Sequence, residues 1–149
     1  MGLGSPLRRD DGLGLSALRR LTERVRLPAS VRVVEGGTPG VGLLDLAGGG
    51  ERLLVLDAVA AGGPPGRLVR LEGDAAVQRG GAPVSAHDLA LPEALALARR
   101  LGRGPGELVV LGLEPESVQP GVGLSAAVAA GLDELVDAAV AQLCRWGVP

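Results

Sequence analysis

Apolar residues recur at helical spacing in two long segments of the chain, which predicts that both are α-helices. In residues 15–25, leucine or valine returns every third or fourth position, with charged residues between. The same spacing marks a final helix that ends at about Trp146, and Ser125 is a suitable N-cap for it. We also expect shorter helices over residues 41–46 and 91–101.

Four short apolar runs predict β-strands between these helices. They cover residues 31–34, 53–56, 68–71 and 108–113. The runs at 53–56 and 108–113 contain no polar residue, as expected for strands buried on both faces of a parallel sheet. Strands that alternate with helices predict an α/β fold. We expect residues 1–149 to form one domain, with a twisted, mostly parallel sheet and helices on both faces.

The composition supports a globular domain with a core of Leu, Val and Ala. The chain is 46% hydrophobic but has no Phe or Tyr and a single Trp. Its 25 Gly and 11 Pro fall between the apolar runs, a placement that indicates many turns rather than disorder.

Charge and cysteine content narrow the class of partner. The formal net charge is −2, and the arginines are dispersed without aromatic platforms, so nucleic-acid binding is disfavoured. No apolar run approaches the ~20 residues of a membrane helix, and the N-terminus has no apolar signal segment. The lone Cys144 excludes an internal disulfide, and we therefore expect a cytoplasmic protein.

Several titratable residues are expected at the carboxyl ends of the strands, where open α/β sheets bind their ligands. Glu35 and Asp57 each follow a predicted strand, His87 lies in the connection after a third, and Asp10 and Asp11 precede the first helix. One imidazole with carboxylates can bind a borderline metal ion such as nickel or zinc. Because the chain has a single histidine, we expect any such chemistry to involve His87.

Each of these residues also has an ordinary structural explanation. Asp10 and Asp11 can cap the N-terminus of the helix that follows them. Asp57 can cap the next turn, and His87 can pair with the adjacent Asp88.

Two further kinds of chemistry fit the sequence less well. Gly2-Leu3-Gly4 resembles part of a dinucleotide-binding fingerprint, but no strand precedes it. A serine hydrolase with His87 as its base would need a nucleophile, and no Gly-x-Ser-x-Gly motif is present. The available serines are Ser16, Ser85, Ser117 and Ser125.

Taken in order, seven segments of the chain resemble the hydrogenase maturation endopeptidases, a nickel-dependent family that trims the large subunit of NiFe hydrogenases. The segments are GLGSPLRRDDGLG (2–14), EGGT (35–38), LLVLDAV (53–59), PGRL (65–68), SAHDL (85–89), GLEPES (112–117) and PGVGLS (120–125). Each segment is weak evidence alone, but together they extend across nearly the whole chain.

The resemblance implies a set of roles. Asp11, Asp57 and His87 would be nickel ligands, and Glu35 would help to position the cleavage site. The nickel would be supplied by the substrate protein, the NiFe-hydrogenase large-subunit precursor, rather than be permanently bound. The endopeptidase, expected to act as a monomer, would detect this nickel and remove the C-terminal extension of the precursor.

Two departures from the family pattern concern the first residues. The family begins with a hydrophobic strand before the Gly-x-Gly turn, and Met1 falls directly on that turn. We therefore expect this strand to be missing, and either the true start to lie upstream or the sequence to be a truncated one. Ser5 stands where relatives usually carry Asn, and both residue types can make local turn hydrogen bonds.

Three hypotheses for function follow. The first is the nickel-dependent endopeptidase. The second is a catalytically inactive relative that checks for nickel by binding without cleavage, and the third is a serine hydrolase of another type.

Overall fold

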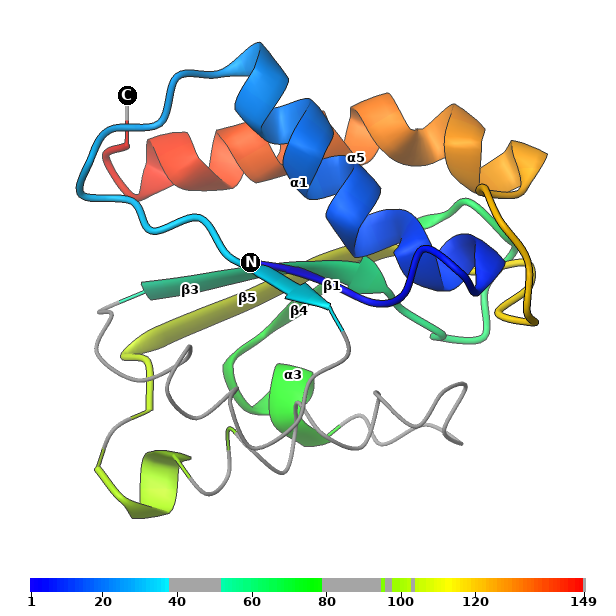
Figure 1. The fold of residues 1–149 in the computed structure, drawn as a ribbon. Helices are drawn as coiled ribbons and strands as arrows, with labels where there is room; N and C mark the ends of the chain where they lie inside the picture. Colours follow the sequence, from blue (N-terminus) through cyan, green and yellow to red (C-terminus); the bar gives the residue numbers. More distant parts are fainter. Residues whose placement is uncertain (38–51, 79–94, 96–97, 103, 149) are drawn as a thin grey trace.

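A computed structural model describes residues 1–37, 52–78, 95, 98–102 and 104–148. The described strands form a five-stranded sheet in the order β2-β1-β3-β5-β4 (Figure 1). They are β1 (Gly2–Leu3), β2 (Glu35–Gly37), β3 (Arg52–Ala58), β4 (Leu68–Glu72) and β5 (Glu107–Leu113). The pairs β2–β1, β1–β3 and β3–β5 are parallel, and β4 runs antiparallel to β5. The predicted mostly parallel α/β fold is confirmed.

Helices cover both faces of the sheet, as expected. The helix α1 (Leu13–Arg24) and the long helix α5 (Ala126–Arg145) lie together on one face, and α3 (Gly73–Gln78) lies on the other (Figure 1). A 3₁₀ turn, η1 (Arg9–Gly12), leads directly into α1. Ser125 caps α5, because its Oγ accepts a hydrogen bond from Val128 N at 3.4 Å.

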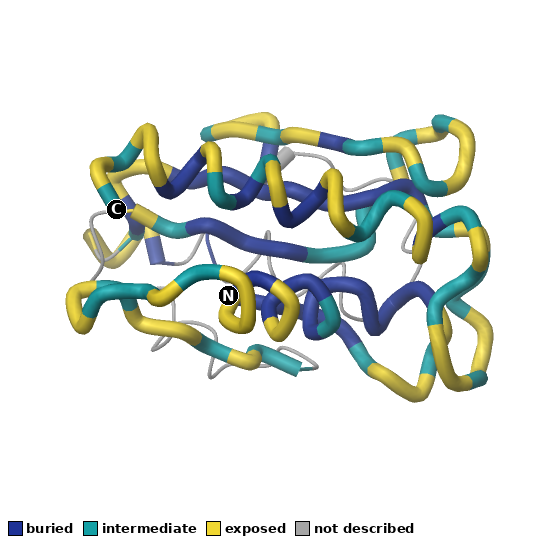
Figure 2. Tube along the Cα trace, turned by 90° about the horizontal axis from the view of Figure 1, so that it is seen from above, coloured by how far each residue is buried: buried dark blue, intermediate teal, exposed yellow. Residues whose placement is uncertain are grey.

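The two central strands alternate their side chains between two cores, which is the period-two pattern of a sheet covered on both faces. On β3, Leu54 and Leu56 pack under α1 and α5, whereas Val55 faces the opposite layer. On β5, Leu111 faces the helix pair and Val110 faces the opposite layer. Seen from the helix side, buried segments run through the centre and exposed turns surround them (Figure 2).

The structure corrects three predictions about strands. Residues 31–34 are not a strand, because the hydrogen-bonded segment is Glu35–Gly37. A first strand is present where we expected none, since Gly2–Leu3 pairs with both β2 and β3 in the interior of the sheet. The strand predicted at 53–56 extends to Ala58, so Asp57 lies within β3 rather than after it.

Part of the prediction falls outside the described residues. The helix expected over 41–46 cannot be compared for that reason. Of the helix expected over 91–101, residues 95 and 98–100 are helical, Leu101 is in a turn, and the others lie outside the described set. Within the described residues, no helix combines the length and apolar character needed to cross a membrane.

Candidate functional site

A tight glycine turn brings the Asp10–Asp11 pair to the carboxyl end of the parallel strands. Gly4 has φ +100°, and a Cβ atom there would overlap the carbonyl oxygen of Asp11. Its backbone N–H donates to Gly37 O at 2.9 Å, which ties the turn to the end of β2. The η1 turn then packs against β3. Only glycine allows this close approach of the two backbone segments.

Helix α1 approaches the sheet so closely that it also requires glycine. A Cβ atom on Gly14 would overlap the carbonyl oxygens of Leu3 and Leu56. This contact fixes the start of α1 against β1 and β3. The η1 residues that precede α1 are therefore positioned by the central strands.

Asp11 is a buried carboxylate that is held by the backbone of the preceding turn. The residue is only 4% exposed, and its Oδ2 accepts a hydrogen bond from Ser5 N at 2.9 Å. No hydrogen bond from the part of the chain that the structure describes reaches Oδ1. The Asp11 carboxylate is thus held through Oδ2 by the backbone of the glycine turn.

Asp57 lies at the same edge of the sheet. It pairs with Gly112 in the register of β3 and β5, one residue before β3 ends. Its Oδ1 accepts a 2.8 Å hydrogen bond from Ala58 N. This is the local turn-type bond that Asp commonly makes, and it fixes the side chain near the strand end.

Glu35 begins β2 and lies opposite Gly2. Its carboxylate is 3.5 Å from Nε of Arg19 on α1, and both side chains are more than half exposed. The role of Glu35 in positioning a cleavage site stays a prediction.

His87, the third predicted nickel ligand, lies outside the described residues. Among the residues that are described, no group of three or more His, Cys, Asp and Glu side chains is arranged to hold a metal ion. The assignment of Asp11, Asp57 and His87 as nickel ligands stays a prediction.

Asp10 has a structural role that sequence reasoning missed. It is fully buried, and its carboxylate accepts hydrogen bonds from the backbone N–H groups of Glu116 (2.9 Å), Ser117 (3.0 Å) and Ser125 (2.6 Å). Burial raises the pKa of Asp10, but these hydrogen bonds outweigh it and hold the pKa below its usual value. A doubled aspartate before a helix gave no signal of this role.

Glu114 is a second buried carboxylate that sequence reasoning missed. It follows directly after β5, is 6% exposed, and accepts hydrogen bonds from the N–H groups of Ala61 and Gly62. The signal was available, because an acidic residue directly after an apolar strand is the pattern that singled out Asp57.

Two alternative explanations lose support from the structure. The N-cap of α1 is Gly12, with no side-chain hydrogen bond, so neither aspartate caps this helix. Three of the four candidate serines are described, and each has a local partner, whereas Ser85 lies outside the described residues. Ser16 Oγ donates to Gly12 O, Ser117 Oγ accepts from Gln119 N, and Ser125 Oγ caps α5.

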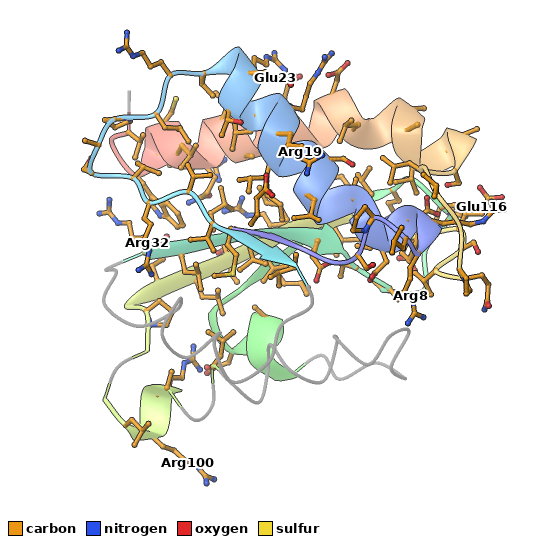
Figure 3. All side chains as sticks on the ribbon, viewed as in Figure 1. Arg8, Arg19, Glu23, Arg32, Arg100 and Glu116 are labelled. Atoms are coloured by element: carbon orange, nitrogen blue, oxygen red, sulfur yellow. The ribbon has the colours of Figure 1, made fainter. Side chains whose placement is uncertain are left out.

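Acidic residues from three segments therefore converge at one edge of the sheet. Asp10 and Asp11 come from η1, Asp57 from β3, and Glu114 from the end of β5. Arg8 and Glu116 lie at this same end of the molecule (Figure 3). The molecule is an α/β protein with several acidic residues at the carboxyl edge of its parallel strands.

Comparison with known proteins identifies the family. The model of the hydrogenase maturation protease family matches residues 16–142. The chain is 30% identical to the hydrogenase 2 maturation protease of Escherichia coli, over 99% of this chain and 91% of that protein. It is 34% identical to the hydrogenase expression/formation protein HupD of Rhodobacter capsulatus, over 99% of this chain and 71% of that protein.

Solved structures agree with this result. The hydrogenase maturating endopeptidase HybD from E. coli superposes with a TM-score of 0.93 at 30% identity, covering 99% of this chain and 91% of that chain. The [NiFe] hydrogenase maturation protease HybD from Thermococcus kodakarensis gives a TM-score of 0.73 at 31% identity, with 95% of each chain covered. The chain belongs to the hydrogenase maturation protease family.

Proposed function

We propose that this protein is an endopeptidase that removes the C-terminal extension of a NiFe-hydrogenase large-subunit precursor after nickel insertion. Family membership supports the reaction class. The observation that carries the proposal for the site is the packing of η1 against β3, which brings the segments of Asp11 and Asp57 to one sheet edge.

Nickel enters this proposal as part of the substrate. Two carboxylates and one imidazole suit nickel and leave coordination positions for ligands from the precursor. Asp11 and Asp57, joined by His87, would contact the nickel already held by the precursor and so test whether it has been inserted. The scissile peptide bond would then be hydrolysed beside the bound metal, and the extension would be released. We propose that this happens in the cytoplasm, with the protease acting as a monomer.

The test uses purified precursor, prepared with and without nickel, and mass spectrometry of its C-terminus. We expect the wild-type protein to trim only the nickel-containing precursor. His87→Ala and Asp57→Ala should leave it untrimmed while circular dichroism shows an unchanged fold. Trimming of nickel-free precursor at the same rate, or normal trimming by folded His87→Ala, would contradict the proposal.

A matched control is available on helix α5. Glu134 is an exposed acidic residue on this helix, and Glu134→Ala should trim the precursor at the wild-type rate. Nickel-dependent association of wild-type protein with the precursor but no cleavage would instead identify an inactive nickel-checking relative.

A further inference from the structure

The connection that follows β3 is fastened to the end of β5 by one buried side chain, Glu114. Both carboxylate oxygens accept from Ala61 N, at 3.0 and 2.9 Å, and Oε1 also accepts from Gly62 N at 3.1 Å. Gly62 has φ +81°, so the carboxylate binds at the point where this connection turns.

Backbone hydrogen bonds fasten the same connection at both of its ends. Val59 N donates to Leu113 O at 3.0 Å, directly after β3. Glu114 N donates to Arg67 O at 2.9 Å, and Gly66 N donates to Glu114 O at 2.8 Å. Residues 59–67 are therefore held at their start, turn and end by Leu113 and Glu114.

A buried carboxylate is a costly way to fill this position. Removing a charge from water is strongly unfavourable unless hydrogen bonds compensate for it. Here the compensation comes from backbone N–H groups, and such charge-assisted bonds are shorter and stronger than neutral ones. An apolar residue would fill the same space but would not bind these N–H groups. The carboxylate therefore fixes the path of the connection that follows β3.

We propose that Glu114 is a positioning residue for Asp57, the nickel-contacting carboxylate at the end of β3. The inference rests on the function proposed above. Asp57 lies two residues before Val59, where the fastened connection begins, and its own side chain binds Ala58 N. A ligand-binding carboxylate must be held within about 0.5 Å of its productive position. Glu114 supplies this restraint from the neighbouring strand.

The experiment compares Ni²⁺ binding by the free protein with precursor trimming in Glu114→Ala and Glu114→Gln. Isothermal titration is done well below the melting temperature of each variant. We expect Glu114→Ala to bind Ni²⁺ about tenfold more weakly, as loss of an outer-shell partner does in metal sites, and to trim the precursor correspondingly more slowly. A purely structural role would lower the melting temperature and leave the Ni²⁺ affinity unchanged, which would overturn the proposal.

Glu114→Gln keeps the result decisive if Glu114→Ala does not fold. The glutamine amide oxygen can still accept from Ala61 N and Gly62 N. The amide NH₂ group, which replaces the second carboxylate oxygen, is itself a donor and would face the N–H of Ala61. We expect Glu114→Gln to bind Ni²⁺ about threefold more weakly than wild type, so that its affinity falls between those of wild type and Glu114→Ala. Wild-type affinity in Glu114→Gln would likewise overturn the proposal.

The matched control is Glu116→Ala, which removes an exposed carboxylate from the same loop (Figure 3). It should bind Ni²⁺ and trim the precursor as wild type does, and an equal loss in this variant would show that Glu114 has no specific role. If wild-type protein neither binds Ni²⁺ nor trims the precursor, the proposed function fails and this inference fails with it. If wild type does both and Glu114→Ala matches it, only the role of Glu114 is wrong.

Discussion

The carboxylate of Asp10 accepts a 2.6 Å hydrogen bond from the backbone N–H of Ser125, the residue that caps α5. This contact joins the turn before α1 to the start of the last helix. The same carboxylate holds the N–H groups of Glu116 and Ser117, which follow β5. The position of the neighbouring Asp11 therefore depends on residues more than 100 positions away in the chain.

Asp10→Ala should destabilise the protein strongly, because it leaves three backbone N–H groups without the buried carboxylate that accepts from them. We expect a loss of about 3 kcal/mol in the free energy of unfolding, measured with urea at pH 7. Asp133 on α5 is the control, since its ion pair with Arg20 is exposed. Asp133→Ala should change stability by less than about 1 kcal/mol. If the two substitutions lowered the free energy of unfolding equally, the three hydrogen bonds to Asp10 would not make the proposed contribution to stability.

The stabilisation by Asp10 should also depend on pH. Although burial raises the pKa of Asp10, the hydrogen bonds from Ser125, Ser117 and Glu116 lower it below the ordinary value of 3.8. A carboxyl whose pKa is lower in the folded state stabilises the fold above the unfolded-state pKa, and this contribution is lost as the pH falls through the folded-state pKa. The stability difference between wild type and Asp10→Asn, measured on metal-free protein, should shrink from pH 7 to pH 3. A constant difference would show that the charge of Asp10 does not contribute.

Gly14→Ala should move α1 away from the sheet. The added Cβ would overlap the carbonyl oxygens of Leu3 and Leu56, which are backbone atoms that cannot rotate away. We expect a loss of about 3 kcal/mol in urea unfolding, despite the better helix propensity of alanine. Ser16→Ala on the same helix removes only a bond to Gly12 O within the helix and should stay within about 0.5 kcal/mol of wild type. A neutral Gly14→Ala would show that the contact is not tight.

The central strands were predictable because strands that are buried on both faces appear in the sequence as continuous apolar runs. Both faces of β3 and β5 are covered, so every position from 53 to 56 and most from 108 to 113 is apolar. At the sheet edge the same reasoning failed. Val33 looks like a strand residue but is 44% exposed. Hydrogen bonding to the two residues of β1 decides the position of β2, and it selects Glu35–Gly37.

The site was predictable only in part, because its organisation depends on backbone contacts. The types and order of Asp11, Asp57 and His87 suggested a ligand set, and the fold brings the segments of the first two to one edge. Asp10 and Glu114 bind backbone N–H groups, which every residue except proline carries, so the identity of these partners could not be read from the sequence, even though the position of Glu114 directly after a strand could. The predicted helix began at residue 15, yet Gly14 lies inside α1, where its lack of a Cβ atom allows the close approach to the sheet.

Asp11→Asn should separate the charge of Asp11 from its structural contact. The asparagine oxygen can still accept from Ser5 N, so the free energy of unfolding should stay within about 1 kcal/mol of wild type. Loss of the negative charge should reduce trimming of the nickel-containing precursor by at least the ~100-fold that removal of an outer-shell partner can cost. The control is Asp137→Asn on the exposed side of α5, which pairs with Arg24. Trimming by Asp11→Asn at the rate of this control would exclude Asp11 as a nickel ligand.

Glu35→Gln tests whether the exposed carboxylate on β2 serves the substrate or only its ion pair. Because the pair with Arg19 is exposed on both sides, breaking it should change the free energy of unfolding by less than about 1 kcal/mol. If Glu35 helps to position the cleavage site, Glu35→Gln should lower the trimming rate about tenfold. Arg19→Ala breaks the same ion pair but keeps the carboxylate, and it should trim the precursor at the wild-type rate. The trimming rates of the two variants are compared by mass spectrometry of the precursor over time. Equal rates would show that the Glu35 carboxylate has no role toward the substrate beyond its surface ion pair.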